Sequence, residues 1–381
     1  MSLQVEIASS ISDIDPASWD ALTDGSPLLS HAFLSALEKT GCVGPGTGWQ
    51  ACPLLVKDQS RLLGAMPLYA KSHSYGEYVF DWAWANAFEQ HGLDYYPKLI
   101  CAIPFTPITG PRICAPDPAI RKLMVEVLSQ QLHSLKLSSA HVLFPDDESA
   151  ESLEKAGWLR RSGVQFRWEN ENFPAFEAFL ATLSHDKRKK IRQERKKIAA
   201  SGIQIRRLTG NDISGEDWEL FYRCYVNTYR QYRSSPYLTK AFFLELAQHM
   251  SRHVLLIVAE RAGEKVAAAL NLYGDDRQGV SQLYGRYWGA LEHVPGLHFE
   301  LCYYQAQEFC IERGIRYFEG GAQGEHKLAR GFRPRPTCSF HRIAHPVFAS
   351  SIAQVLEREA GMMELYQSEL EERAPFRRNQ F

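Results

Sequence analysis

The sequence predicts an α/β (α+β) fold built from two tandem copies of one unit, with mixed sheets flanked by helices. The chain has 381 residues, which is long for a single domain. Residues 279–332 read as strand, helix, strand and short helix. Two short patterns also recur. Leu62–Tyr69 resembles Val266–Tyr273, and Glu154–Trp158 resembles Leu328–Phe332. A duplicated unit explains both the length and the order of these elements.

Composition narrows the class of protein. Hydrophobic residues make up 45% of the chain and charged residues 23%, as in ordinary globular proteins. The net charge of −1 excludes a global attraction to nucleic acid or membrane, so any anion site must be local. The first residues do not resemble a signal peptide, and no apolar run is long enough to span a bilayer. We therefore expect a cytoplasmic protein without an integral membrane segment.

Cysteine and histidine spacing gives no metal motif. The eight cysteines are scattered without a CxxC pair, which predicts free thiols. Two histidine pairs have i,i+4 spacing, His249/His253 and His341/His345, but neither has an accompanying carboxylate motif. We expect no metal site.

The first copy is expected to occupy residues 1–170, with strands and helices separated by turn residues. Strands are predicted at Leu3–Ile7, Gln50–Lys57, Arg61–Lys71, Glu77–Ala85, Ala140–Phe144 and Trp158–Trp168. Helices are predicted at His31–Thr40, Asn86–Ala102, Pro118–Leu137 and Glu148–Ala156.

The predicted strand Glu77–Ala85 places acidic side chains on one face and aromatic side chains on the other. This alternation has two interpretations. The acidic face is either simply solvated or it looks into a cleft. In the second case Glu77 and Asp81 bind substrate.

The second copy, residues 171–381, includes a basic helix at 185–200 and a C-terminal helix at 347–373. Within it, Gly279–Trp288 is a predicted strand and 289–296 a turn. Helix Leu297–Arg313 follows and ends at Gly314, then come strand Arg316–Glu319 and short helix Glu325–Arg330. A βαβ unit binds ligands beyond the carboxyl ends of its strands. The polar residues expected there are Tyr284, Arg286, Tyr287, Glu300, Gln323, Glu325, His326 and Lys327.

Glu300, Glu325 and His326 are the candidate proton-transfer groups. On a helical wheel Glu300 falls within a broad apolar arc, where desolvation favours a general acid or base. Alternatively, it only stabilises the first turn through the helix dipole. His326 suits proton transfer near neutral pH. The alternative is that Glu325 caps a short helix while His326 packs on a neighbour.

The basic helix carries the densest local charge. Residues 187–197 contain eight Lys or Arg against one Glu. Like charges at i,i+4 repel by about 0.2–0.5 kcal/mol per pair, so the helix gains from a counter-anion. One interpretation is a solvated helix. The other is that Lys187, Arg188 and Arg192 hold a phosphate-bearing substrate.

Five segments carry a family resemblance, namely His73–Trp84, Pro104–Arg112, Tyr284–Trp288, His298–Tyr304 and Gly321–Phe332. With them the sequence resembles the FemAB-like predicted N-acyltransferases of the GNAT (acyl-CoA N-acyltransferase) superfamily, over nearly its whole length. The resemblance implies two GNAT-type domains in tandem and transfer of an acyl or aminoacyl group to an amine. It also implies acceptors such as nucleotide-linked cell-wall precursors, and aminoacyl-tRNA as a possible donor.

One departure bears on the donor. Acetyl-CoA-using GNAT enzymes bind the CoA pyrophosphate on an Arg/Gln-x-x-Gly-x-Gly/Ala turn at a helix N-terminus. The nearest match here, Arg286–Leu291, ends in Leu, and the helix begins several residues later. The donor is therefore left open between acyl-CoA (such as acetyl-CoA) and aminoacyl-tRNA.

We expect the second copy to carry the chemistry. Glu300, Glu325 or His326 would deprotonate the accepting amine, and Tyr284 or Tyr287 would donate a proton to the leaving group. Arg286, Gln323 and Lys327 would bind the anionic part of a substrate, and backbone amides of splayed strands would hold the carbonyl oxygen. The alternatives are an aminoacyl-tRNA-dependent transferase and a non-catalytic binding protein on a degenerate GNAT fold. The oligomeric state is not predicted.

Overall fold

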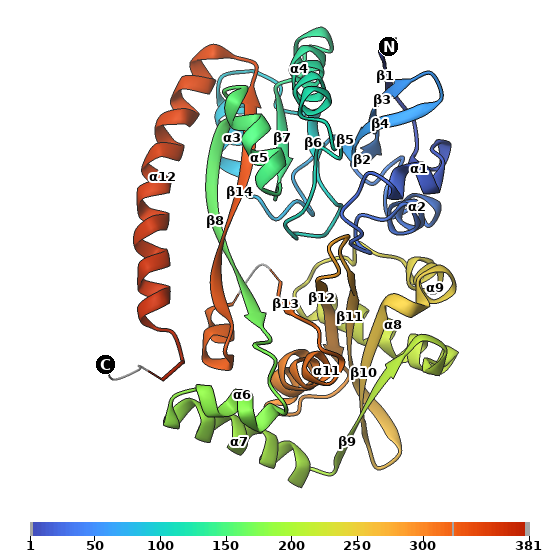
Figure 1. Cartoon of the computed structure of the whole chain (residues 1–381), viewed down its shortest axis with the longest axis vertical. Coiled ribbons are helices and arrows are strands. Elements are labelled where there is room, and N and C mark those ends of the chain that lie inside the picture. Colours follow the sequence, from blue (N-terminus) through green and yellow to red (C-terminus); the bar gives the residue numbers. More distant parts are fainter. Residues whose placement is uncertain (1–2, 322–323, 378–381) are drawn as a thin grey trace. The chain divides into compact units, whose positions relative to one another are not determined.

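The structure is a computed structural model that describes residues 3–321 and 324–377. It divides into two compact units (Figure 1). Unit 1 comprises the residues up to Val164 together with Pro336–Gln367, and unit 2 comprises Gln165–Arg335 together with the residues from Ser368 on. The first division lies close to the predicted boundary at residue 170. Most of the C-terminal helix, however, groups with unit 1.

Unit 1 contains two sheets. The smaller, antiparallel sheet has the order β1 (Leu3–Ile7), β3 (Leu54–Asp58), β4 (Arg61–Met66). The strands of unit 1 in the larger sheet follow the order β2 (Trp49–Ala51), β5 (Leu68–Lys71), β6 (Lys98–Cys101), β7 (Ser139–Leu143), β14 (Arg333–Ile343). Strands β6 and β7 are parallel, and the pairs β2–β5, β5–β6 and β7–β14 are antiparallel.

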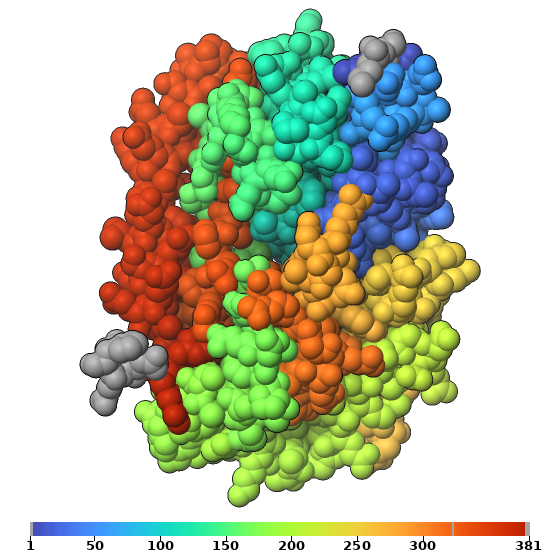
Figure 2. Space-filling view, in the orientation of Figure 1, coloured from blue at the N-terminus to red at the C-terminus, as the bar shows by residue number. Residues whose placement is uncertain are grey.

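The helices of unit 1 begin at good caps. Asp15, Ser30, Asp117 and Asp146 each accept a hydrogen bond from a first-turn backbone N–H. The helices are α1 (Pro16–Asp20), α2 (His31–Lys39), α3 (Trp82–Gln90), α4 (Pro118–Ser134), α5 (Asp147–Lys155) and α12 (Pro346–Glu372). Along one side α12 is exposed to solvent (Figure 2, red).

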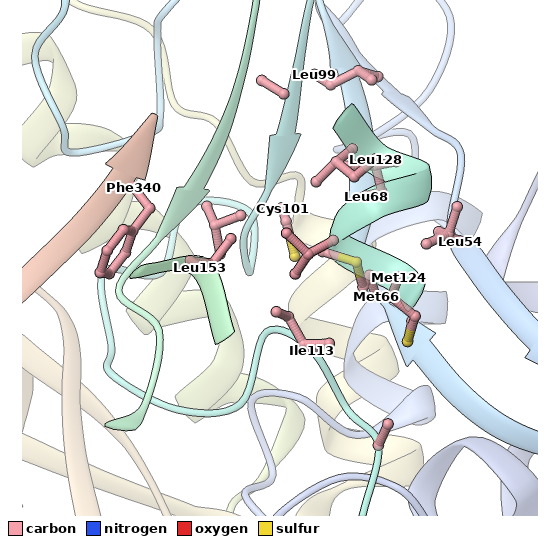
Figure 3. Packing of buried hydrophobic residues seen from close by; sticks show 14 of the residues in the cluster. Leu54, Met66, Leu68, Leu99, Cys101, Ile113, Met124, Leu128, Leu153 and Phe340 are labelled. Atoms are coloured by element: carbon pink, nitrogen blue, oxygen red, sulfur yellow. The ribbon is translucent and has the colours of Figure 1, made fainter. Parts of the chain in front are cut away.

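The core of unit 1 lies between α4 and the two sheets. Met124 and Leu128 of α4 are fully buried against Leu54 of the smaller sheet and Leu99 and Cys101 of the larger one (Figure 3). A second cluster explains why α12 belongs to this unit. Ile352 and Leu356 of α12 pack in it with Trp84, Phe88, Tyr95 and Ile343.

Unit 2 is built on the rest of the larger sheet. Its order is β8 (Leu159–Glu169), β13 (Tyr317–Glu319), β12 (Ser281–Ala290), β11 (Glu264–Asp275), β10 (Val254–Arg261), β9 (Ile203–Thr209). Strands β12 and β13 are parallel, and the neighbouring pairs are antiparallel. The helices before the central strands are α6 (Phe176–Thr182), α7 (His185–Ala200), α8 (Gly215–Gln231) and α9 (Lys240–His249).

The predicted helix Leu297–Arg313 is present with a change of winding inside it. It begins as α10 (Leu297–Phe299), continues as a π-helical turn (Glu300–Tyr304, η4) and ends as α11 (Gln305–Arg313). Gly314 terminates it in the left-handed region, with φ of 68°. A single-turn π segment within an α-helix is frequent at functional sites.

Two predicted elements near Glu77 are wrong. Residues 72–81 form a loop rather than a strand, and Asn86–Ala102 is not one helix because α3 ends at Gln90 and β6 covers Lys98–Cys101. Gly76 and Tyr78 have φ values of 81° and 61°, which no strand accommodates. In this loop the side chains of Glu77 and Asp81 point inward and bind the buried Lys98.

The remaining global predictions concern thiols and membranes. All eight cysteines lie within the described residues and are free, as predicted. In the described parts of the chain, no helix combines the length and apolar character that crossing a bilayer requires.

Candidate functional site

The candidate site in unit 2 begins at an irregularity between β11 and β12. Leu270 lies opposite Tyr287 and Asn271 lies opposite Gly285, so Arg286 is an extra residue on β12. Such a bulge bends its strand and increases the local twist. The bulge changes the direction of the β12 backbone close to the point where the neighbouring strand β13 ends.

Strands β12 and β13 separate just before this bulge. Their parallel pairing ends at Tyr284 and Glu319, while β12 continues to Ala290. A cavity of about 130 Å³ opens at the separation. It is lined by Ala269, Leu270, Asn271, Gly285, Arg286, Tyr287, Trp288, His298, Cys302, Tyr303, Phe318 and Gly320. Backbone of two strands and side chains of the π turn therefore share one small space.

His298 lines this cavity, and a second imidazole, His326, contacts it through Tyr303. The phenolic oxygen of Tyr303 is 2.9 Å from Nε2 of His326. The ring of His298 lies 5.5 Å from that of Tyr303 and 6.0 Å from that of His326. Burial, followed by the electrostatic effect of neighbouring His326, Arg330 and Lys327, lowers the pKa of His298 to about 4. Burial, then Lys327 and Arg330, also lowers the pKa of His326. Both rings are therefore neutral at pH 7 and able to accept a proton.

Two ionisable groups with shifted pKa values, Lys327 and Glu319, lie behind the cavity. The ammonium of Lys327 donates to the carbonyl of Gly321 at 2.8 Å, and burial lowers its pKa to about 8. Burial raises the pKa of Glu319 to about 7, against the opposing effect of Arg167, Arg335 and Lys327. Both groups can exchange protons near neutral pH, as functional groups in clefts often do.

The structure brings only some of the predicted site residues to the cavity. Arg286 and Tyr287 line it, and His326 contacts it through Tyr303. Tyr284 is buried on β12 at the last paired position. Glu325 pairs with Arg373 at 2.8 Å. Gln323 lies outside the described residues.

Glu300 is buried, as its place on the helical wheel suggests, but it faces α7 rather than the cavity. Arg195 of α7 lies 3.1 Å from Glu300 and 2.6 Å from Glu308, and Gln305 donates to Glu300 at 2.8 Å. These contacts satisfy the Glu300 carboxylate and fasten α7 to the helix.

Sequence reasoning missed His298, Cys302 and Tyr303 as cavity residues. On a regular α-helix, positions i and i+5 lie about 140° apart, so a wheel separates His298 from Tyr303. The π turn bonds residue i to i+5 and brings the two rings to one side. Glu319 was also missed, because it reads as an ordinary strand residue.

The outer face of α7 is a separate basic surface. Ile191 and Ile198 are buried, whereas a groove of about 460 Å³ on the other side is lined by His185, Arg188, Lys189, Arg192, Gln193 and Lys196. Arg192 pairs with Glu177 at 2.5 Å. Arg188, Lys189 and Lys196 have no ion-pair partner among residues 3–321 and 324–377. Lys187 lines a different depression with Glu325, His326 and Arg373.

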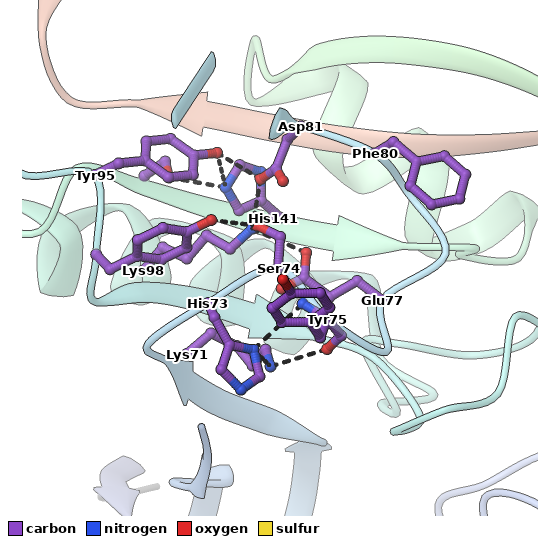
Figure 4. A network of polar contacts seen from close by, with 12 residues as sticks. Lys71, His73, Ser74, Tyr75, Glu77, Phe80, Asp81, Tyr95, Lys98 and His141 are labelled. Carbon is purple, nitrogen blue, oxygen red and sulfur yellow. Dashed lines mark hydrogen bonds and ion pairs between the residues drawn. The ribbon is translucent and has the colours of Figure 1, made fainter. Parts of the chain in front are cut away.

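Glu77 and Asp81 form a buried network in unit 1 (Figure 4). The ammonium of Lys98 donates to Ser74 at 2.8 Å, to Glu77 at 2.9 Å and to Asp81. Burial raises the pKa of Glu77 to about 7. Burial also acts on Asp81, but the charge of Lys98, the effect of His141 and hydrogen bonds from Lys98 and Ser74 together lower its pKa. Through Lys98, both carboxylates thus attach the loop 72–81 to strand β6.

The network continues into the sheet through Tyr95, which donates to Asp81 at 2.6 Å. His141 lies 3.3 Å from the Tyr95 hydroxyl, and its Nδ1 is 2.7 Å from Nδ1 of His341. Burial lowers the pKa of His141 to about 3 and that of His341 well below its ordinary value. Ser139 and Ser339 occupy the remaining imidazole nitrogens. All of these polar groups are buried inside unit 1 and bond to one another.

A family model described as FemAB-like, peptidoglycan biosynthesis/recognition, matches residues 10–378. The chain belongs to the FemAB-like family. No curated protein sequence matches it.

Solved structures with this fold include L-PGS from Bacillus licheniformis, with 12% identity, TM-score 0.54, and coverage of 90% of this chain and 97% of that one. FemX has 12% identity and TM-score 0.53, covering 93% of this FemAB-like chain and 100% of its own. The C-terminal domain of a putative lysylphosphatidylglycerol synthetase from Agrobacterium fabrum has 9% identity, TM-score 0.52 and coverage of 93% and 98%. The predicted fold class, α/β with mixed sheets flanked by helices, is confirmed.

Proposed function

We propose that this FemAB-like protein is an N-acyltransferase that uses the cavity of unit 2 to transfer an acyl or aminoacyl group to an amine. The observation that carries the proposal is the separation of β12 from β13 beyond Tyr284 and Glu319. It leaves space for a carbonyl group beside strand backbone and beside two imidazoles that burial keeps neutral.

In the proposed reaction the amine nitrogen attacks the donor carbonyl. The new C–N bond forms, the C–S or C–O bond to the carrier breaks, and the carrier leaves with the bonding electron pair. His326, with Tyr303 as its hydrogen-bond partner, takes the proton from the ammonium so that the nitrogen lone pair is available. Tyr287 donates a proton to the leaving sulfur or oxygen. Backbone N–H groups at the bulge hold the carbonyl oxygen as it becomes negative.

The charged residues near the cavity suit an anionic substrate. Arg286 lies on the bulge and lines the cavity, and Lys327 is buried behind it. We assign both to orienting the anionic part of the substrate, because fixed positive charges in a partly buried site interact strongly with anions. A phosphate-bearing cell-wall precursor would fit this requirement as acceptor.

Two features favour aminoacyl-tRNA over acyl-CoA as the donor. Residues 286–290 lie within strand β12, and 287–290 pair with β11, so they do not form a pyrophosphate-binding turn. Gly289 serves close packing instead, since an added Cβ would lie 2.1 Å from the carbonyl oxygen of Cys224 in α8. The basic groove of α7 offers Arg188, Lys189 and Lys196 to a phosphate backbone.

Incubation of the full chain with either labelled acetyl-CoA or labelled aminoacyl-tRNA, and a set of amine acceptors, tests the proposal. We expect label in the acceptor with aminoacyl-tRNA, and a loss of at least about 100-fold in His326→Ala. Transfer from acetyl-CoA but not from aminoacyl-tRNA would support the acyltransferase assignment and would show that the donor is acyl-CoA. Transfer from neither donor, with salt-dependent RNA binding intact, would favour a non-catalytic binding protein.

A further inference from the structure

The N-terminal strand β1 has one unpaired edge. In the smaller sheet β1 pairs only with β3, in the order β1-β3-β4. The register places Leu3, Val5 and Ile7 opposite Asp58, Val56 and Leu54. An exposed edge strand offers a row of unpaired backbone groups to another strand.

The hydrogen-bond phase of the ladder shows which backbone groups are available. The N–H of Ala8 donates to the carbonyl of Pro53 at 3.0 Å, in the same register. Because hydrogen-bonded and non-hydrogen-bonded pairs alternate in an antiparallel ladder, Gln4 and Glu6 direct their N–H and C=O groups to β3. Leu3, Val5 and Ile7 direct theirs away from it. In the described chain these outward groups have no hydrogen-bond partner.

The side chains of the same three residues are apolar and incompletely covered. Leu3, Val5 and Ile7 are 41–43% exposed, and they share one face of the strand. On that face their neighbours across the ladder, Val56 and Leu54, are fully buried in the core of unit 1. The apolar face of the sheet therefore continues to its edge strand β1, whose apolar side chains are partly exposed to solvent.

We propose that β1 is the contact between two copies of this chain, which pair antiparallel about a twofold axis at Val5. In this register Val5 faces Val5 of the second copy, and Leu3 faces Ile7 of the second copy. The outward N–H and C=O groups of Leu3, Val5 and Ile7 then bond across the axis, and the two three-stranded sheets become one.

Charge and register both support a second copy as the occupant. On the opposite face Gln4 meets Glu6 of the second copy, and Glu6 is already paired with Lys57 at 2.6 Å, so like charges do not meet. A one-residue slip would place Leu3 against Glu6, so the alternation excludes slips by an odd number of residues. The strand is thus complementary to itself in the register centred on Val5.

The proposed interface between the two copies is small, so the dimer is expected to be weak. Stable dimers bury about 1,200–2,000 Å² in total, and two five-residue strands bury less. We therefore expect a reversible dimer that dissociates on dilution. The proposal is independent of the transfer reaction assigned to unit 2, so either can fail without the other.

Sedimentation velocity of the full chain from about 1 to 500 µM, compared between two matched variants, tests the pairing. Native protein and Gln4→Lys are expected to shift from monomer to dimer across this range, because Lys at position 4 meets Glu6 of the second copy. Val5→Lys, one residue away, is expected to remain a monomer because it places two like charges on the axis. A native chain that stays monomeric throughout, or a Val5→Lys variant that still dimerises, would overturn the proposal.

Amide hydrogen exchange supplies a readout at the level of single residues. The N–H groups of Leu3, Val5 and Ile7 should exchange at least about tenfold more slowly at the highest concentration than at the lowest, whereas those of Gln4 and Glu6 should not change. In Val5→Lys the concentration dependence should disappear, with Gln4 and Glu6 still protected as evidence that β1 is folded. Equal exchange at all five positions and all concentrations in the native chain would contradict the pairing.

Discussion

The phenolic oxygen of Tyr303 and Nε2 of His326 lie 2.9 Å apart at the cavity of unit 2. The two residues come from the π turn of one helix and from the short helix 325–330. Because burial disfavours the charged form of both groups, this is a neutral hydrogen-bonded pair, as the proposed proton transfer requires.

Removal of either member of the pair should slow transfer. We expect His326→Ala to lower kcat by about 10²–10⁴-fold, and Tyr303→Phe by a smaller factor, because the phenol positions the imidazole but need not leave it inactive. Single-turnover assays measure both, with Tyr232→Phe, a highly exposed tyrosine elsewhere in unit 2, as control. Full activity in His326→Ala would remove His326 from the reaction.

The acid limb of the pH–rate profile should depend on Lys327. Burial and the positive charges of Lys327 and Arg330 lower the pKa of His326, so the base stays neutral below its ordinary pKa of 6.5 and activity persists there. Replacement of Lys327 by Met removes one positive charge, raises the pKa of His326 and moves the acid limb of kcat/KM to higher pH. An unchanged limb in Lys327→Met would assign it to another group.

The Arg195–Glu300 ion pair is expected to matter for stability. Arg195→Met would leave Glu300 buried without its cation and lower the free energy of unfolding by about 3–5 kcal/mol. Glu300→Gln should lower the melting temperature while the remaining folded protein keeps its turnover. If Glu300→Gln instead abolished turnover at an unchanged melting temperature, Glu300 would be catalytic, as the helical wheel allowed.

Unit 1 should lose stability on mild acidification because of its two buried histidines. The folded-state pKa of His141, about 3, lies below its ordinary value of 6.5, and that of His341 is also lowered. Between these values the unfolded chain binds more protons, so stability falls as the pH falls below 6.5, by up to about 1.4 kcal/mol per pH unit for each imidazole. Urea titrations at several pH values measure this slope, which His141→Gln should reduce. Glu77 opposes it, because its raised pKa, about 7, gives the folded state the extra proton over part of the same range.

Charge reversal on α7 should weaken nucleic-acid binding without unfolding the chain. Arg188→Glu and Lys189→Glu change exposed or half-exposed residues that have no ion-pair partner in the described chain. We expect weaker tRNA binding and a smaller salt slope of log K for each, since each lost phosphate contact removes about one unit of that slope. Lys39→Glu, an exposed change on α2, is the matched control. Equal loss in the control would mean nonspecific attraction.

The architecture could be read from the sequence where local signals were strong. The bounds Leu297–Arg313 are correct because Gly296 and Gly314 both adopt left-handed conformations at its ends. The loop at 72–81 could not be read, since the alternation of Glu77 and Asp81 with aromatic residues comes from Lys98, a partner many residues away. Long-range charge partners leave no local pattern.

The site was predictable only in outline. Arg286 and Tyr287 could be predicted as site residues because ligands of a βαβ unit bind beyond the carboxyl ends of its strands, and both residues line the cavity. His298 and Tyr303 were hidden by the assumption of regular α-helical winding, and Glu300 was placed correctly in a buried arc but satisfied by Arg195. The π-helical winding decided the first of these outcomes, and side-chain pairing across elements decided the second.

The π turn at Glu300–Tyr304 has an evolutionary consequence. It contains one residue more than an α-helical turn would need, so loss of a single codon there would restore regular winding without breaking the helix. His298 would then rotate by about 100° relative to the downstream residues and leave Tyr303 behind. Descendants that carry this deletion would keep the helix but lose the side-by-side placement of His298 and Tyr303, and Arg195 could no longer bind Glu300 and Glu308 together. The length of this one segment would then distinguish relatives that retain the proposed site from relatives that do not.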